Sequence, residues 1–580
     1  MVGNWRYRLG SVTLDARRDT VTGPSGEVRL QPRVTDFFVC LAQRPGEVVD
    51  RQRLIAEVWD NYPGADQSLS NAASKLRGAL EAAGGDRASL ETVPRRGYRL
   101  RSEDLEEIPA SQPTVPRIAV LPFRTLGLDP EDEYLGEAIA EDLHYALGEA
   151  QGISITARTS SFALAQRGEP LSEFASQLGA TIAIEGTVRR TAGTLLLRIA
   201  LSATEAGVQH WSADFEVPEV RIGSLSTKIF EALCEELRIT QSINLQRRAY
   251  QRSPDVSAAA YKAFLKGRYF WYRENSNPGR AMELYRQAIE LAPEFAAPYA
   301  GLVDCFCSYG AWQMMPQKQA RKMALSSAEQ AYSIAPESTS AQFSHGYAQF
   351  YARWRWDGAE KMFRRVLRRQ PDHILANSFL GMLLTALRRD DEAIQVGNRL
   401  VELDPASSWC WWIRGLWAFY RRDFECMAEC GVEALEVSPD DPLVLWIASA
   451  GLAHCGDISR ARTLVAELES RAGRLDIFLG IAATVRIFCG ERRKAESLCA
   501  ELENRSRERS VSPLVMSFVY GSLGRSEAAL DALEAAYEER NMVLWFASRE
   551  LTLDCLRDQP RFDALLSKMR LPRCDPASRD

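Results

Sequence analysis

In the second half of this chain a proline recurs every 34 residues. Pro371, Pro405 and Pro439 end the similar tetrapeptides RRQP, ELDP and EVSP. A repeat of this length holds two helices, and each pair of helices buries its apolar faces only by stacking against its neighbours. The sequence therefore predicts that residues 257–570 form an all-α solenoid.

The repeat resembles the tetratricopeptide family. Residues typical of that family stand before the prolines: Ala281, Tyr285, Ala288, Ala359, Phe363, Leu380, Gly381, Ala393, Trp411, Gly415 and Ala434. The small ones recur because paired helices cross closely there. Pro293 and Pro336 close similar phrases at a spacing of 43 residues, so we expect an insertion near 312–319, and the tail at 559–571 is typical of a capping helix.

Near the amino terminus, residues 67–80 have the spacing of an amphipathic helix, with Asp66 as the expected N-cap. Its apolar stripe consists of Leu69, Ala73, Leu76 and Leu80. Its other side carries Asn71, Ser74, Lys75 and Gly78, flanked by Ser70 and Arg77. A face of short polar side chains and cations can lie in the major groove of DNA.

The elements around this helix follow a familiar order. A β-rich start at 5–31 precedes two helices. After the 67–80 helix, the segment SLETVPRRGYRL alternates apolar and polar residues about a Pro94–Gly97 turn, as a hairpin does. This order, with the stretches LQPRVTDFFVCLAQRPGEVVDRQRLIAEVW, SKLRGAL and ETVPRRGYRL, resembles the OmpR/PhoB-type winged helix-turn-helix domain. We assign it to residues 1–101.

The resemblance implies a set of DNA contacts. It places one group of residues in the major groove: Ser70, Asn71, Ser74, Lys75 and Arg77. It sends the hairpin arginines Arg95 and Arg96 to the adjacent minor groove or backbone. Arg51 and Arg53 start the second helix, where they can meet phosphate, or remain plain solvated charge.

Two features qualify the resemblance. Ala72 and Ala73 stand where the family often has bulkier or polar residues, so its base preference does not carry over. The loop at 60–68 corresponds to one that contacts RNA polymerase in some family members, which makes the polymerase an implied partner.

The net charge of −6 argues against a DNA-binding protein until it is divided by segment. Residues 1–101 hold 16 Lys and Arg against 12 Asp and Glu, a net charge of +4. Residues 102–240 hold 10 against 22, and the remainder 45 against 43. The cationic excess therefore lies on the segment expected to bind DNA.

Residues 117–240 form a second expected domain, after a polar, proline-containing linker at 102–116. Strand and helix patterns alternate and end in a meander, which indicates a small α/β domain. The words IAVLPF, ARTSSFA, GATIAIEGTVRR and HWSADF resemble the N-terminal domain of TolB, a resemblance that implies no chemistry. Thr159, Ser160 and Ser161 with Arg158 can either bind an anion or cap a helix.

An aromatic cluster, SWCWWIRGLWAFYRR, lies in the repeat region. At helical spacing Trp411 fits a core position, while Trp409, Trp412 and Trp417 are candidates for a groove that holds a protein partner or a small effector. Core packing is the alternative for all of them.

The sequence shows no motif of a catalytic or nucleotide-binding site, and we expect no enzyme activity and no cofactor. The 12 cysteines form no CxxC pair, as in reduced proteins. Cys426 and Cys430 with His454 and Cys455 leave a metal clip open, although core cysteines are the favoured interpretation, so no metal is expected.

The fold class is thus multidomain: a winged helix, a small α/β domain and a tetratricopeptide solenoid. We predict a sequence-specific DNA-binding transcriptional regulator of HilA-like layout, whose other domains bind a protein or effector and which can form a homodimer. Since no apolar run spans a membrane, unlike in the CadC/ToxR-like family, we expect a cytoplasmic location. A signalling adaptor that does not bind DNA is the alternative, and a cyclase-like remnant a third hypothesis.

Overall fold

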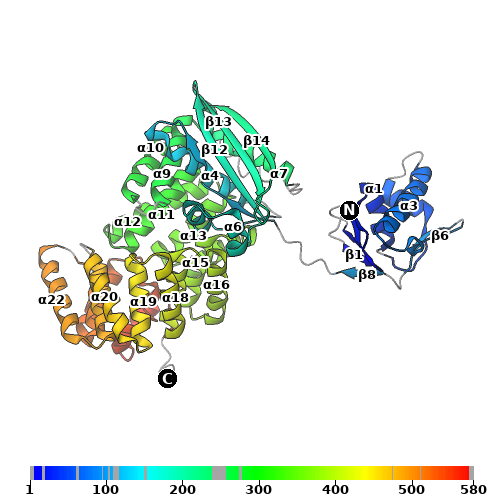
Figure 1. Cartoon of the computed structure of the whole chain (residues 1–580). Helices are drawn as coiled ribbons and strands as arrows, with labels where there is room; N and C mark the ends of the chain where they lie inside the picture. The colour runs from blue at the N-terminus through cyan, green and yellow to red at the C-terminus, as the bar shows by residue number, and fades with distance from the viewer. Residues whose placement is uncertain are drawn as a thin grey trace. The chain divides into compact units, whose positions relative to one another are not determined.

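A computed structural model describes residues 6–15, 20–42, 44–59, 65–94, 96–101, 105–108, 116–148, 153–237, 256–272, 277–472, 475–509 and 511–573. The chain divides into two compact units, Met1–Val115 and Pro116–Asp580. Both are drawn in Figure 1.

The first unit combines two small antiparallel sheets with three helices. Its elements in order are β1 (Arg6–Leu9), β2 (Val12–Asp15), β3 (Thr20–Gly23), β4 (Gly26–Arg29), α1 (Pro32–Ala42), β5 (Val49–Asp50), α2 (Arg51–Trp59), α3 (Ala65–Ala82), η1 (Arg87–Ser89), β6 (Leu90–Val93), β7 (Gly97–Leu100) and β8 (Leu105–Ile108). The sheets have the strand orders β4-β3-β2-β1-β8 and β5-β7-β6. This is the winged helix-turn-helix arrangement that the sequence predicts.

Two details of this unit differ from expectation. α3 begins at Ala65, so Asp66 lies inside its first turn instead of before it. β8, at Leu105–Ile108, pairs antiparallel with β1, although we had assigned residues 102–116 to a linker. The four residues of β8 read Leu-Glu-Glu-Ile, which lacks the apolar–polar alternation that would distinguish a strand from a polar linker.

The second unit begins with a three-layer α/β part. Its elements are β9 (Arg117–Val120), β10 (Arg124–Leu126), η2 (Pro130–Asp132), α4 (Tyr134–Gly148), β11 (Ser154–Ile155), α5 (Arg158–Gln166), α6 (Leu171–Leu178), β12 (Ile182–Thr191), β13 (Thr194–Ala203), β14 (Gln209–Pro218), η3 (Glu219–Ser224) and α7 (Leu225–Glu236). The sheet order is β11-β9-β12-β13-β14, and β10 also pairs with β12. Ile118 and Val120 face the α4 side, while Ala119 and Leu121 pack with α5 and α6.

The rest of the second unit is a chain of antiparallel helical pairs. They are α9 (Ala258–Tyr272), α10 (Pro278–Leu291), α11 (Ala296–Ala311), α12 (Gln317–Ile334), α13 (Thr339–Ala348), η4 (Gln349–Arg353), α14 (Trp356–Arg369), α15 (Ile374–Ala386), α16 (Asp390–Leu403), α17 (Ser408–Arg421), α18 (Phe424–Val437), α19 (Pro442–His454), α20 (Ile458–Ala472), α21 (Asp476–Phe488), α22 (Arg492–Glu508), α23 (Pro513–Ser522) and α24 (Ser526–Glu538). Each helix packs on the next, as a tetratricopeptide solenoid requires. The expected insertion is the turn after Ala311 and the lengthened helix α12.

The α/β part and the solenoid share one hydrophobic core, which runs without a break from Ile118 to Leu571. α9 packs against α4, and a buried group links them: Arg268 lies 3.3 Å from Asp142, which also accepts hydrogen bonds from Tyr261 and Ser226. The change of fold type near residue 240 is therefore not a break between compact units.

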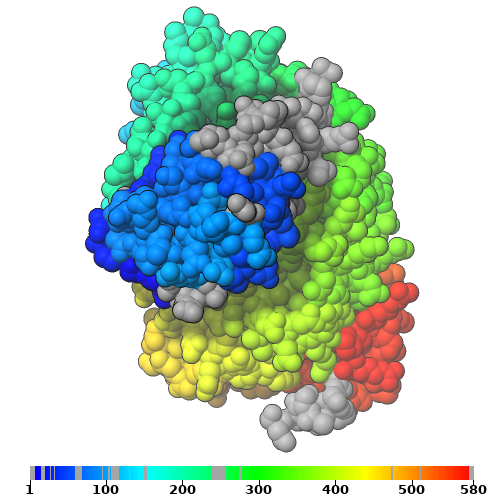
Figure 2. Space-filling view, turned by 90° about the vertical axis from the view of Figure 1, so that its right-hand side faces the viewer, coloured from blue at the N-terminus to red at the C-terminus, as the bar shows by residue number. Residues whose placement is uncertain are grey.

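The carboxyl-terminal segment folds back onto the solenoid. After α24 the chain forms η5 (Leu544–Phe546), η6 (Leu551–Leu556) and α25 (Pro560–Met569). Trp356 Nε1 donates a hydrogen bond of 2.9 Å to Met569 O, and the red C-terminal residues lie against green ones in Figure 2. The predicted helix at the tail is confirmed, and it packs beside a repeat more than 200 residues earlier in the chain.

Candidate nucleic-acid interface

Helix α3 has the two faces that its sequence predicts. Leu69, Ala73, Leu76 and Leu80 are buried in the core of the first unit. The exposed residues of α3 include Asn71, Ser74, Lys75 and Gly78, and Ser70 is half-buried. Because this face has no large apolar side chain and no carboxylate between Asn71 and Gly78, it is sterically and electrostatically open to a nucleic-acid groove.

Ala72 and Ala73 are both buried, at 3% and 1% exposure. Their small size therefore fits the packing of α3 on the core and does not shape the exposed face. The exposed positions alone carry whatever base preference this helix has.

Lys75 and Arg77 lie in different surroundings. Lys75 Nζ donates a hydrogen bond of 2.7 Å to the exposed side-chain oxygen of Gln31, which precedes α1. Such an exposed contact exchanges readily with water or phosphate, so the ammonium group stays available at the surface.

Arg77 instead ties α3 to the hairpin. Its Nε and one terminal nitrogen donate to Leu90 O at 3.0 and 2.9 Å, and the same nitrogen donates to Thr92 Oγ1 at 2.7 Å. The sequence places this guanidinium in the major groove. Arg77 is half-buried, and its Nε and one terminal nitrogen hold the hairpin, so a direct contact with DNA stays a prediction beside this positioning role.

The hairpin itself, β6 with β7, forms the predicted wing. Val93 pairs with Gly97, and Gly97 also pairs with Asp50 of β5. A Cβ at Gly97 would lie 1.9 Å from Val49 O, so only glycine allows these strands to approach. Arg96 is exposed at the turn, whereas Arg95 lies outside the described residues.

Arg51 and Arg53, the suggested phosphate contacts, both have partners within the first unit. Arg51 donates to Tyr98 Oη at 3.4 Å and to Ser70 Oγ at 3.3 Å, which links α2, α3 and β7. Arg53 forms an exposed ion pair of 2.7 Å with Glu57. Sequence patterns do not reveal the Arg51 contacts, because these join residues that are distant along the chain.

The predicted groove tryptophans separate into two kinds. Trp417 is fully buried, and a Cβ on Gly381 would lie 2.0 Å from its ring, so it belongs to the packing between helices and not to a groove. Trp409 and Trp412 line an internal cavity. Trp411, which we expected in the core, is half-buried and donates to Pro405 O at 2.8 Å.

The groove is also partly occupied by the chain itself. Trp545 and Phe546 of η5 are buried against the solenoid, and Trp545 packs on Phe350 and Tyr420 at centroid distances of 5.7 Å. The C-terminal segment therefore shares the cavity walls with Trp409 and Trp412. A partner groove at Trp409 and Trp412 stays a prediction, whereas the full burial of Trp417 removes that residue from it.

The Ser/Thr cluster of α5 is used inside the fold. Ser160 bonds Asp404 through both its backbone N–H and its hydroxyl, and Arg158 forms an ion pair with Glu141. Ser161 bonds Thr156. With a buried carboxylate at this helix end, an anion site here is contradicted.

No group of three or more His, Cys, Asp and Glu is arranged to hold a metal among the described residues. His454 instead stacks on Phe424 with ring centroids 3.9 Å apart. Within the same residues, no helix is both long and apolar enough to cross a membrane.

Comparison with known proteins finds a family match within the first unit. Residues 25–100 match the family described as "Transcriptional regulatory protein, C terminal". This segment belongs to that family. It contains α1, α2, α3 and the β6–β7 wing, so the exposed face of α3 lies in a DNA-binding domain of transcriptional regulators.

Curated relatives extend the similarity. The transcriptional regulator HilA of Salmonella typhimurium is 21% identical over 456 residues, which cover 77% of this chain and 79% of HilA. The transcriptional activator CadC of Escherichia coli (strain K12) is 31% identical over 114 residues, or 18% of this chain and 22% of CadC. A Rhizobium meliloti protein named "Putative adenylate cyclase 3" is 26% identical over 197 residues, 34% of this chain and 33% of that protein. This chain thus spans a third or less of two of these relatives.

Among solved structures, the DNA-binding domain of Escherichia coli CadC is 26% identical, with a TM-score of 0.17, and the match covers 18% of this chain and 96% of that domain. A tetratricopeptide repeat protein from Parabacteroides merdae is 14% identical, with a TM-score of 0.32, over 47% of this chain and 98% of that one.

Proposed function

We propose that this protein is a sequence-specific DNA-binding transcriptional regulator whose second unit receives a protein or small-molecule signal. In this proposal α3 enters the major groove with Ser70, Asn71, Ser74 and Lys75. The wing brings Arg95 and Arg96 to the neighbouring minor groove or backbone. Contacts with RNA polymerase and a homodimer remain predictions from the family resemblance.

The observation that carries the proposal is the exposed face of α3, held at a set position relative to the wing. Arg77 fastens α3 to β6, and Arg51 fastens α2 to both α3 and β7. Because these side-chain hydrogen bonds join α3 to the wing, the two elements would approach adjacent grooves of the DNA as one rigid unit. Such preorganisation lowers the entropy cost of binding.

The test is selection of genomic DNA fragments by the full-length protein, followed by affinity measurements on the enriched fragment and on a scrambled one at fixed salt. Lys75→Ala should weaken binding to the enriched fragment by about 1–3 kcal/mol if Lys75 contacts a base. Lys322→Ala, which removes an exposed cation of α12, serves as the matched control. If no fragment is preferred over random competitor at low salt, the winged helix does not read DNA, and the signalling-adaptor function takes its place.

A further inference from the structure

A cavity of about 280 Å³ lies on the inner side of the solenoid. Side chains from the first helix of each successive pair line it, from α9 through α11, α13, α15, α17, α19 and α21 to α23. The C-terminal segment supplies the remaining wall with Trp545, Phe546, Glu550 and Thr552. The volume is close to that of sites that hold a small organic molecule.

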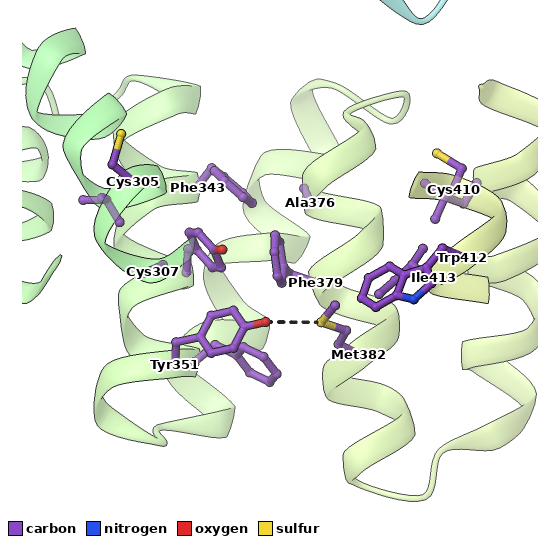
Figure 3. Packing of buried hydrophobic residues seen from close by; sticks show 14 of the residues in the cluster. Cys305, Cys307, Phe343, Tyr351, Ala376, Phe379, Met382, Cys410, Trp412 and Ile413 are labelled. Atoms are coloured by element: carbon purple, nitrogen blue, oxygen red, sulfur yellow. Dashed lines mark hydrogen bonds between the residues drawn. The ribbon is translucent and has the colours of Figure 1, made fainter. Parts of the chain in front are cut away.

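The walls are dominated by aromatic rings. Trp312 lies 6.2 Å from Trp412, which in turn lies 5.0 Å from Trp409 and 6.2 Å from Trp446, all measured between ring centroids. Figure 3 shows Tyr351 of η4, Phe379 and Met382 of α15, and Trp412 of α17 along one side of the helical array. Aromatic rings attract a cation that lies over their faces, so a cluster of rings around one space favours a cationic occupant.

The ionisable side chains that line the cavity are all acidic. Asp304 and Glu550 both line the cavity, and no Lys, Arg or His is among the described lining residues. Oδ1 of Asp304 is buried and accepts no hydrogen bond, and Trp412 Nε1 is buried without an acceptor. Buried polar atoms without partners are uncommon in folded proteins, so Asp304 and Trp412 offer an acceptor and a donor to a ligand in the cavity.

These features select the class of ligand. An anion would meet two carboxyl groups without a compensating cation, at a high desolvation cost. A purely apolar ligand would leave Asp304 without a partner. A cationic group would pair with a carboxylate and lie against the tryptophan faces at the same time.

We propose that this cavity binds a small organic cation, an ammonium or amidinium group on a compact apolar or aromatic body, and that this ligand is the effector of the regulator. The effector role rests on the proposed function, whereas the binding site does not. Asp304 is the counter-ion on α11, and Glu550 joins the ligand to the C-terminal segment. Because Glu550 caps η6 through Thr552 N, occupancy of the cavity would bear directly on that segment.

The experiment titrates the full-length protein with three probes of the same size: 2-phenylethylammonium, neutral 2-phenylethanol and anionic 3-phenylpropionate. Calorimetry and tryptophan fluorescence both report binding, since six tryptophans line the cavity. The ammonium probe should bind about tenfold or more tighter than the alcohol, and the anion should not bind. Equal affinity for ammonium and alcohol, binding of the anion, or no saturable binding of the ammonium at millimolar concentration would each overturn the proposal.

Asp304→Asn keeps the side-chain shape and removes the charge. It should lower the affinity for the ammonium probe by about tenfold or more and leave that for the alcohol unchanged. Asp391→Asn, at an exposed carboxylate in the first turn of α16, is the matched control. An unchanged ammonium affinity in Asp304→Asn would overturn the role of Asp304.

DNA affinity, measured on the same preparations, keeps the two proposals apart. Ammonium binding without DNA preference would retain the cavity site and reject the regulator. DNA preference without ammonium binding would retain the regulator and reject the cavity site. Ammonium binding that leaves the DNA affinity unchanged would retain the site and reject its role as effector site.

Discussion

Ser160, near the start of α5, donates both its backbone N–H and its hydroxyl to one carboxylate oxygen of Asp404, at the end of α16. Asp404 is 2% exposed, and burial raises the pKa of its carboxyl group to about 6, against the lowering effect of the Ser160 hydrogen bonds. Asp404 directly precedes Pro405, one of the prolines that mark the repeat. The turn between two repeats of the solenoid thus binds helix α5 of the α/β part.

Ser160→Ala should therefore destabilise the second unit. The change removes the hydroxyl from a buried carboxylate, which costs about 1–3 kcal/mol of the free energy of unfolding. Urea unfolding measures the effect, and Ser176→Ala, at an exposed serine of α6, is the control. A Ser160→Ala protein as stable as the parent would show that this contact does not hold the α/β part on the solenoid.

Contacts of this kind explain what the sequence could not predict. The buried stripe of α3 follows from helical spacing alone, because Leu69 and Leu76 lie on one face whatever the rest of the chain does. Ser160 and Asp404 are separated by 244 positions, and no local pattern relates them. The sequence offered only the local interpretations of an anion site or a helix cap.

The roles of the tryptophans in the α17 cluster could not be separated from the sequence, for another reason. In SWCWWIRGLW, aromatic residues occupy all sides of α17, so spacing cannot distinguish the side that faces the cavity from the side that faces the neighbouring helix. Gly381 decides the position of Trp417, because the space left by its missing side chain receives the ring. That pairing is visible only when α15 and α17 are placed together.

Arg77→Ala should loosen the wing before DNA is present. The loss of the hydrogen bonds to Leu90 O and Thr92 Oγ1 removes the side-chain link between α3 and β6. We expect amide hydrogen exchange in β6 and β7 to become faster in the free protein, and DNA affinity to fall as a result. If DNA affinity falls while hydrogen exchange is unchanged, Arg77 contacts DNA directly, as the family resemblance implies.

Replacing the wing arginines should change the salt dependence of DNA binding. Arg96 is exposed at the turn, and a phosphate contact from it would release a counterion. Arg96→Ala should lower the slope of log affinity against log salt by about one, and Arg95→Ala should do the same if it also binds phosphate. Lys322→Ala again gives the reference, and an unchanged slope would remove Arg96 from the interface.

The stability of the second unit should depend on the pH through Asp304. Burial raises the pKa of its carboxyl group from 3.8 to about 7. The folded protein therefore keeps the proton where the unfolded chain has lost it, so this contribution is complete below about pH 4 and is lost as the pH rises to about 7. The unfolding constant should rise by up to about tenfold per pH unit across that range, less so in Asp304→Asn. Glu550, with a pKa also raised by burial to about 7, should retain part of the slope in the variant.

Arg549 should be the residue that holds the C-terminal segment in place. Its guanidinium is 9% exposed, forms an ion pair of 2.8 Å with Asp390, and donates to Tyr420 O at 2.8 Å. Arg549→Met keeps the aliphatic stem and removes these bonds, at an expected cost of about 1.5–3 kcal/mol in the free energy of unfolding. Trp545 and Phe546 belong to the same segment, just before Arg549 in the chain. Their release should therefore expose the cavity to solvent and shift the tryptophan fluorescence to longer wavelength.

Arg561→Met supplies the control for that change. Arg561 forms ion pairs with three acidic side chains of α24, Glu527, Asp531 and Glu534, and all four side chains are exposed to solvent. Its loss should cost about 1 kcal/mol or less. Equal losses from Arg549→Met and Arg561→Met, with no spectral shift in either, would mean that the segment is held by its apolar contacts alone. The cavity wall would then not depend on the Arg549–Asp390 pair.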